Sequence, residues 1–134
     1  MTSTPDTPGL PRVYDLELPW AKPPLNANQR LHWRAKARMV KAVRRTAWAL
    51  ARNAKIPACA HIRVWLVYQP RDSRRRDPSN LMPTQKPSLD GLVDAGIVPD
   101  DTPEYVTESI PRIVPPVSGQ PGKLWLHVEA WPAA

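Results

Sequence analysis

The sequence predicts an α+β domain of two layers, in which two main helices pack on a mixed β-sheet. Alternating apolar and polar residues indicate strands near both ends and in the middle of the chain. One long stripe of apolar residues at helical spacing indicates a helix, and a second helical segment precedes the last strands. The expected order is therefore β-α-β-α-β-β. A length of 134 residues suits one domain.

The chain is expected to begin with a tail. Prolines recur among small polar residues over 1–12, which predicts a disordered segment that cannot bury apolar surface. The single folded domain then covers 13–134. Its first strand is expected at 13–18, where apolar side chains alternate until Pro19 ends the strand.

A helix is expected over roughly 29–54, because 25–56 contains neither proline nor glycine and carries apolar residues at spacings of three and four. These apolar residues are Trp33, Ala37, Val40, Val43, Ala47, Leu50 and Ala54. Basic residues repeat on the opposite side, namely Arg34, Arg38, Lys41, Arg45 and Arg52. Such a row can contact a phosphate backbone, and the alternative is an ordinary solvated helix face.

The middle of the chain predicts a strand and a second helix. The strand is expected at 62–68 and is closed by Pro70. Apolar residues occupy both of its faces, which is typical of a central strand. The helix is expected within 80–96, with Gly96 as its C-terminal cap. Pro87 is expected to kink or restart this helix, since proline removes a helical hydrogen bond.

Two further strands complete the predicted sheet. One is expected at 104–113, and Pro111 places it at a sheet edge because proline cannot donate to a strand ladder. The last is expected at 124–131, where apolar and polar residues alternate again.

Charge is distributed unevenly along the chain. Residues 1–76 hold 16 basic and 4 acidic side chains, whereas residues 77–134 hold 3 basic and 8 acidic ones. The net charge of +7 is typical of proteins that meet polyanions, so nucleic acid is the expected partner. A run of arginines extends the basic surface of the first half, namely Arg71, Arg74, Arg75 and Arg76.

Other classes of function have little support. The single cysteine, Cys59, excludes a disulfide framework within the chain and a cysteine-based zinc site, and it favours a reducing cytoplasm. No apolar run is long enough for a membrane span, so we expect a soluble cytoplasmic protein with no membrane partner. No phosphate-binding loop is present, so no nucleotide cofactor is expected.

The acidic segment after the arginines is the remaining candidate for chemistry. Asp77 follows the arginine run directly, Asp90 lies on the second predicted helix, and Asp100 and Asp101 follow the end of that helix. Lys86 shares a helix face with Asp90, four residues away. Close carboxylates repel a phosphate backbone unless a cation lies between them, so this segment indicates metal-assisted chemistry on nucleic acid.

Oxygen ligands from two or three carboxylates suit Mg²⁺, or Mn²⁺ in its place, because these ions keep water ligands and bind substrate phosphates. The alternative is that the acids have ordinary capping and surface roles, of which Asp94 and Glu108 are examples. On residue types alone, both interpretations stay open.

Three stretches of this acidic region resemble the signature of the RusA family of Holliday junction resolvases. They read R-R-R-D-P-S-N-L at 74–81, K-P-S-L-D-G-L at 86–92 and D-A-G-I-V-P-D-D at 94–101. Upstream, L-P-W at 18–20 and P-P-L-N at 23–26 are similar to the entry of the same family. The proline-rich form of the block is similar to that of bacteriophage members.

The resemblance implies a RusA-like fold and a homodimeric, Mg²⁺-dependent endonuclease that cuts four-way DNA junctions by paired symmetric nicks during DNA recombination and repair. For a phage-encoded member it implies action in the bacterial host cytoplasm. Carried over by motif position, Asp77 and Asp101 are metal ligands together with Asp90, Asp100 completes the acidic site, and Lys86 stabilises phosphate charge in the transition state.

The sequence departs from the family pattern in two ways: 81–85 holds three extra positions ahead of Lys86, and one position of the acidic block differs. Ser79 stands where the family has its second aspartate, two residues after Asp77. This departure predicts weaker metal binding or lower activity. It leaves open a branched-DNA-binding protein of the same fold that cuts poorly, and a general RNA- or single-strand-binding module in which the acids are structural.

Overall fold

The computed structural model describes residues 9–134, and residues 1–8 of the predicted tail lie outside them. Within the described residues, five strands form one mixed sheet in the order β1-β5-β2-β3, with β4 also paired to β2. The prediction of an α+β domain with two main helices on a mixed sheet is confirmed. The elements are β1 (Arg12–Glu17), α1 (Trp33–Asn53), β2 (Cys59–Gln69), the 3₁₀ turn η1 (Pro78–Leu81), α2 (Met82–Asp94), β3 (Val106–Glu108), β4 (Arg112–Ile113) and β5 (Lys123–Pro132).

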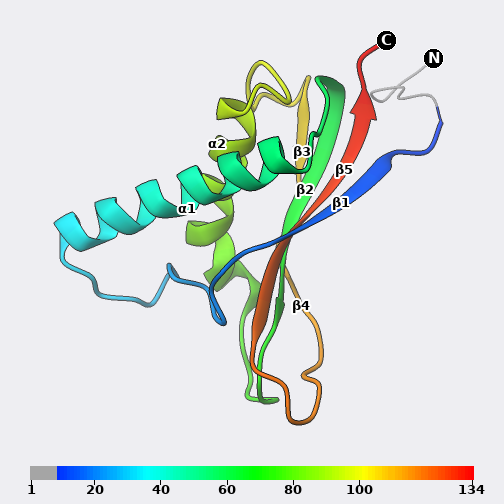
Figure 1. The fold of residues 1–134 in the computed structure, drawn as a ribbon. Helices are drawn as coiled ribbons and strands as arrows, with labels where there is room; N and C mark the ends of the chain where they lie inside the picture. Colours follow the sequence, from blue (N-terminus) through cyan, green and yellow to red (C-terminus); the bar gives the residue numbers. More distant parts are fainter. Residues whose placement is uncertain (1–8) are drawn as a thin grey trace.

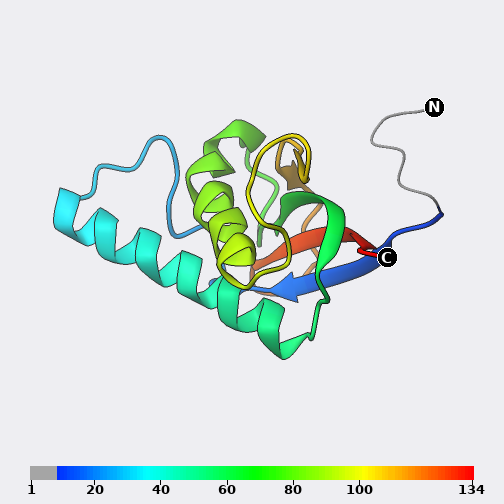
Figure 2. The same ribbon diagram turned by 90° about the horizontal axis from the view of Figure 1, so that it is seen from above.

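Strand β2 is central, as its two apolar faces predict. It pairs antiparallel with β5 and parallel with the short strands β3 and β4, while β1 pairs antiparallel with the far side of β5. Both helices lie on one side of the sheet (Figures 1 and 2), and they cover the face that carries Ile62, Val64 and Leu66. These three side chains are fully buried, so this face of the sheet forms the core.

The two ends of the predicted sheet differ in detail. Strand β1 begins at Arg12, one residue before the predicted start of the domain. Arg12 pairs with Ala130 of β5. The single strand predicted at 104–113 is wrong, because β3 and β4 are separate and Pro111 lies between them. Proline cannot donate to the ladder, and the break is held instead by Ser109, whose N–H donates to the Val64 carbonyl at 3.0 Å.

Helix α1 extends beyond the core at its N-terminal half (Figure 2). It begins at Trp33, later than predicted, and Trp33 is 67% exposed although it belongs to the predicted apolar stripe. Val43 and Ala47 of that stripe are fully buried, together with Ala51. Leu50 of the predicted stripe is only partly buried, and Ala54 is exposed beyond the end of the helix. The periodicity therefore located the centre of the buried face, whereas the first half of the helix extends beyond the core.

Helix α2 does not restart at Pro87, so one of the two effects predicted for this proline is wrong, and the kink stays a prediction. The helix runs from Met82 to Asp94 with Pro87 inside it, and the 3₁₀ turn precedes it. Proline at this position removes only the hydrogen bond to the Pro83 carbonyl, in the first turn of the helix. The Pro87 ring is buried. The C-terminal end is as predicted, because Gly96 adopts φ of +81°, the left-handed conformation that glycine tolerates.

The two helices touch where Gly91 of α2 faces α1. A Cβ atom at Gly91 would lie 2.8 Å from the Cβ of Ala47 and 2.9 Å from the backbone N of Trp48, and it would clash with the Arg44 carbonyl. Only glycine permits this approach, so the position of α2 on α1 depends on it.

The loop between β1 and α1 is fixed to α2 by a buried threonine. Thr84 is fully buried, and its Oγ1 donates to the Leu25 carbonyl at 2.6 Å and accepts from the Leu25 N–H at 3.1 Å. Leu25 is itself buried in the core. The long proline-containing loop therefore has one firm attachment point.

Among residues 9–134, neither helix combines the length and apolar character needed to cross a membrane.

Substituting Gly91→Ala is expected to lower the free energy of unfolding by about 1–3 kcal/mol, because the added methyl overpacks the helix crossing. Equilibrium urea denaturation measures this change. On helix propensity alone, alanine would stabilise α2 by about 1 kcal/mol, so a more stable variant would contradict the close crossing.

Candidate active site

Two of the predicted acids converge on one lysine. Lys86 lies on α2, and its Nζ bonds the carboxylate of Asp101 in the loop after the helix. The same nitrogen lies 3.8 Å from Oδ1 of Asp90, one helical turn further along α2. All three side chains are partly exposed. Helix α2 and the following loop thus place two carboxylates around one cationic atom.

A third carboxylate, Glu108 at the end of β3, lies near this pair. Its Oε2 accepts a hydrogen bond of 3.2 Å from Gln85 Nε2, and its charge helps to raise the pKa of Lys86. The largest contribution to that raised pKa is the hydrogen bond from Lys86 to Asp101. Glu108 was expected to be an ordinary surface acid, and only the parallel pairing of β3 with β2 brings it to Lys86.

Gln85, next to Lys86, fixes this arrangement from inside the core. The side chain is fully buried, its Oε1 accepts from the Leu66 N–H at 2.8 Å, and its Nε2 donates to the Ser109 carbonyl at 2.7 Å. It joins α2 to the central strand and to the break between β3 and β4. Sequence reasoning missed Gln85, because a single glutamine in a helix gives no signal of burial.

The loop that carries Asp101 is anchored on both sides. Asp100 accepts the Asp101 N–H at 2.7 Å, and the buried His61 contacts the Glu104 carbonyl through Nδ1 at 3.0 Å and Thr107 Oγ1 through Nε2 at 2.8 Å. The bond from Lys86 holds the pKa of Asp101 below its ordinary value. Asp100 therefore acts on the backbone of the loop, while Asp101 faces the lysine.

Asp77 has a different position, at the start of the 3₁₀ turn. Its Oδ1 accepts from the Ser79 N–H at 3.0 Å and from Ser79 Oγ at 2.9 Å, and these two bonds lower the pKa of Asp77. The carboxylate lines a hollow of about 550 Å³ with Asn26, Asn80 and the arginine loop. Ser79, at the position where the RusA pattern has its second aspartate, is thus a hydrogen-bond donor to Asp77.

The predicted metal ligands are divided between these two places. Within residues 9–134, no group of three or more His, Cys, Asp and Glu side chains is arranged to hold a metal ion. Asp77 precedes α2, whereas Asp90 lies eight residues after its first residue, Met82, which is about 12 Å along the helix axis. The structure brings Asp90 and Asp101 together, and a single ion shared with Asp77 stays a prediction.

The pair of carboxylates does fit a divalent cation of the predicted kind. Mg²⁺ is held in proteins by one or two carboxylates, with waters and substrate phosphates as its other ligands. Asp90 and Asp101 already surround a cationic group, the Lys86 ammonium, and are open to solvent. Such an ion would take the place of the ammonium between them.

The arginine loop contains two kinds of residue. Arg71, Arg74 and Arg75 are exposed. Arg74 and Arg75 line the Asp77 hollow, and Arg71 lines a second hollow that shares Arg74 with it. Arg74 also lies 3.3 Å from the Asp72 carboxylate. Arg76 is held in place, because it donates to the Asp72 carboxylate at 2.8 Å and lies over the Tyr68 ring. Arg76 thereby serves the loop structure, and the three exposed arginines fit the predicted contact with phosphates.

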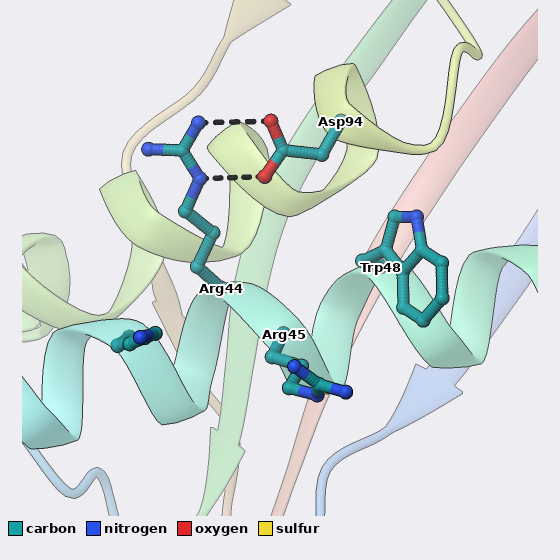
Figure 3. Close-up of a pocket in the computed structure, with 5 residues that line it drawn as sticks. Arg44, Arg45, Trp48 and Asp94 are labelled. Carbon is teal, nitrogen blue, oxygen red and sulfur yellow. Dashed lines mark hydrogen bonds and ion pairs between the residues drawn. The ribbon is translucent and has the colours of Figure 1, made fainter.

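The predicted basic row on α1 lies on the exposed side of the helix. Its members, Arg34, Arg38, Lys41, Arg45 and Arg52, are exposed, and none of them forms an ion pair with another described residue. The neighbouring Arg44 instead forms two hydrogen bonds to Asp94 of α2, at 2.6 and 2.8 Å (Figure 3). Asp94 thus joins α2 to α1 and has a structural role, which is the alternative that the sequence left open for it.

Comparison with known proteins gives one relative and no family. No family model matches the chain. Over 92 residues it is 30% identical to a protein of Xylella fastidiosa that is described only as uncharacterized. The matched part covers 65% of this chain, and the chain spans 60% of the length of that relative.

Substituting Lys86→Met is expected to raise the pKa of Asp101 toward the ordinary aspartate value, because the bond that lowers it is lost. Carboxyl-carbon NMR titration measures this pKa. The matched control is Arg44→Met, which removes the partner of Asp94 and should move the pKa of Asp94 but not that of Asp101. An unchanged Asp101 titration in Lys86→Met would contradict the site geometry.

The pH dependence of stability follows from the same pair. The pKa of Asp101 is lower in the folded state than in the unfolded state. Its carboxylate therefore contributes fully to the free energy of unfolding above the unfolded-state pKa, and this contribution is lost as the pH falls through the folded-state pKa. The pKa of Lys86 is higher in the folded state than in the unfolded state. Its ammonium group therefore contributes fully to the free energy of unfolding below the unfolded-state pKa, and this contribution is lost as the pH rises through the folded-state pKa.

Proposed function

We propose that this protein is a Mg²⁺-dependent, structure-selective endodeoxyribonuclease that resolves four-way DNA junctions by paired nicks. The observation that carries the proposal is the convergence of Asp90 and Asp101 on Lys86 in an otherwise basic protein. The sequence resemblance to the RusA family supports the choice of substrate, and it implies activity in the cytoplasm of a bacterial host.

Surface ion pairs contribute little to stability, typically about 0–1 kcal/mol. A half-exposed lysine that bonds one carboxylate, lies 3.8 Å from a second and is influenced by the charge of a third is therefore poorly explained by folding alone. Such a group is well explained as a place where a phosphate and a divalent cation meet, since both can replace the internal ion pairs.

In the proposed mechanism, Asp90 and Asp101 would hold the metal ion, which would supply neutralisation of phosphate charge and activation of a water molecule. Lys86, released from Asp101, donates to a non-bridging oxygen of the scissile phosphate and stabilises the charge that develops there. Asp100 keeps the Asp101 backbone in place. Gln85 holds α2 against β2, which keeps Lys86 and Glu108 at a fixed separation.

The basic surfaces hold the DNA backbone on either side of this centre. The row on α1 tracks one strand, and Arg71, Arg74 and Arg75 contact phosphates near the Asp77 hollow. Two symmetric nicks require two identical centres, which a homodimer with two-fold symmetry provides.

A second candidate function is a branched-DNA-binding protein that cuts weakly, and Ser79 favours it. The hydroxyl of Ser79 donates to Asp77, whereas an aspartate there would add a second carboxylate to the Asp77 hollow. Binding without efficient cleavage would follow if the metal needs both carboxylates.

The purified protein is expected to nick an end-labelled four-way junction at symmetric positions with Mg²⁺ or Mn²⁺ but not with EDTA, and to leave a matched linear duplex intact. Asp101→Asn should abolish nicking while DNA binding persists. Glu17→Gln changes an exposed acid on β1 and is the matched control that should cut normally. Equal nicking of both substrates, or none with either metal, would contradict the proposal.

If the metal is held at Asp77, as the second candidate function requires, substituting Ser79→Asp is expected to strengthen Mg²⁺ binding and to increase the nicking rate, because a second carboxylate joins Asp77. The new charge should also raise the pKa of Asp77 when no metal is bound, since the hydrogen bond from the Ser79 hydroxyl is replaced by repulsion between two carboxylates, while the bond from the backbone N–H of residue 79 is kept. Calorimetric Mg²⁺ titration measures the binding. Unchanged affinity and rate would show that the Asp77 hollow takes no metal.

A further inference from the structure

A hollow of about 470 Å³ lies where α1 crosses α2, apart from the carboxylate pair at Lys86. It is lined by Lys41, Arg44, Arg45, Trp48 and Asp94 and is called here the Trp48 hollow (Figure 3). Sites for small ligands in proteins typically measure about 300–1,000 Å³, so one nucleotide unit fits this space.

The charge of the Trp48 hollow suits an anion. Arg44 and Asp94 neutralise each other through their two hydrogen bonds. Lys41 and Arg45 form no ion pair with any described residue, so the hollow carries two uncompensated positive charges. The Nη1 group of Arg44 takes no part in the bonds to Asp94 and remains available as a donor.

The aromatic wall of the hollow belongs to the basic row of α1. Trp48 continues the spacing of four and three residues, so the complete row reads Arg34, Arg38, Lys41, Arg45, Trp48 and Arg52. Trp48 is only partly buried. The Arg52 guanidinium lies 5.5 Å from the centre of the Trp48 ring and does not line the hollow, which leaves part of the indole open.

The Trp48 hollow also lies next to the candidate active site. Asp94 lines the hollow, and Asp90 lies one turn earlier on the same side of α2. A strand that passes from the hollow to Lys86 therefore follows one face of α2.

We propose that the Trp48 hollow binds one unpaired nucleotide of a DNA strand, with the base against the Trp48 indole and its phosphate between Lys41 and Arg45. The proposal rests on DNA being the substrate, as proposed above. Stacked and paired bases within a duplex do not present a ring face, whereas an unpaired base does. The hollow would thus favour branched or single-stranded DNA over linear duplex.

The test measures DNA binding without cleavage, in EDTA, by fluorescence anisotropy. The probes are a short single-stranded oligodeoxynucleotide and the same sequence as a linear duplex. Trp48→Ala should weaken single-strand binding by about 5- to 100-fold, because one base–indole stack is lost, and should leave duplex binding nearly unchanged. Trp48→Phe should restore most of the affinity, which also shows that the loss is not a folding defect.

The matched control is Trp33→Ala, which removes an exposed indole of the same helix that also has an arginine stacked on it but lies outside the hollow. It should bind both probes as the wild type does. A 2-aminopurine base in the single strand should be quenched by the wild type and not by Trp48→Ala.

The outcomes separate this inference from the proposed function. Equal loss on both probes, or no loss in Trp48→Ala, overturns the nucleotide site while DNA binding itself stands. Failure of the wild type to bind either probe overturns both proposals. Selective loss in Trp48→Ala supports the nucleotide site whether or not the protein cleaves junctions.

Discussion

The crossing of α1 and α2 at Gly91 is the contact on which the arrangement of the functional residues depends. Because Gly91 has no side chain, α2 approaches the backbone of α1 at Arg44 and Ala47. This approach lets Arg44 reach Asp94 and forms the Trp48 hollow between the two helices. The apolar side of α2, with Leu89 and Leu92, faces the core. Its remaining edge is left to present Lys86 and Asp90 to solvent.

Buried polar side chains on the same helix attach the neighbouring loops. Thr84, Gln85 and Ser88 are fully buried, and each has hydrogen-bond partners within the chain. A buried polar group without a partner costs about 1–3 kcal/mol, so Thr84 and Gln85 strongly favour one arrangement of the segments that they bond. Ser88 bonds the Thr84 carbonyl of its own helix. The position of Glu108 relative to Lys86 follows from the bonds of Gln85. The candidate site is thus built on the core rather than on mobile surface groups.

The basic and the acidic side chains lie on different parts of the surface. The row on α1 and the exposed arginines of 71–76 have few acidic neighbours, which suits contact with a polyanion. The carboxylates gather around Lys86 instead, where they would repel phosphate in the absence of a cation. A basic surface with one acidic centre is consistent with a protein that holds DNA broadly and acts on it at one point.

The sequence by itself determined the fold class, the central strand and the second half of the α1 stripe, because period and proline placement are local properties of the chain. It also singled out Lys86, Asp90 and Asp101, because these residues lie on the second helix or in the loop that follows it, and such positions are local properties of the chain. The tertiary structure alone decided that Asp77 lies apart from them and that Glu108 joins them. Strand pairing and helix crossing bring together residues that are far apart in the sequence. No local sequence pattern predicts which of these residues will be in contact.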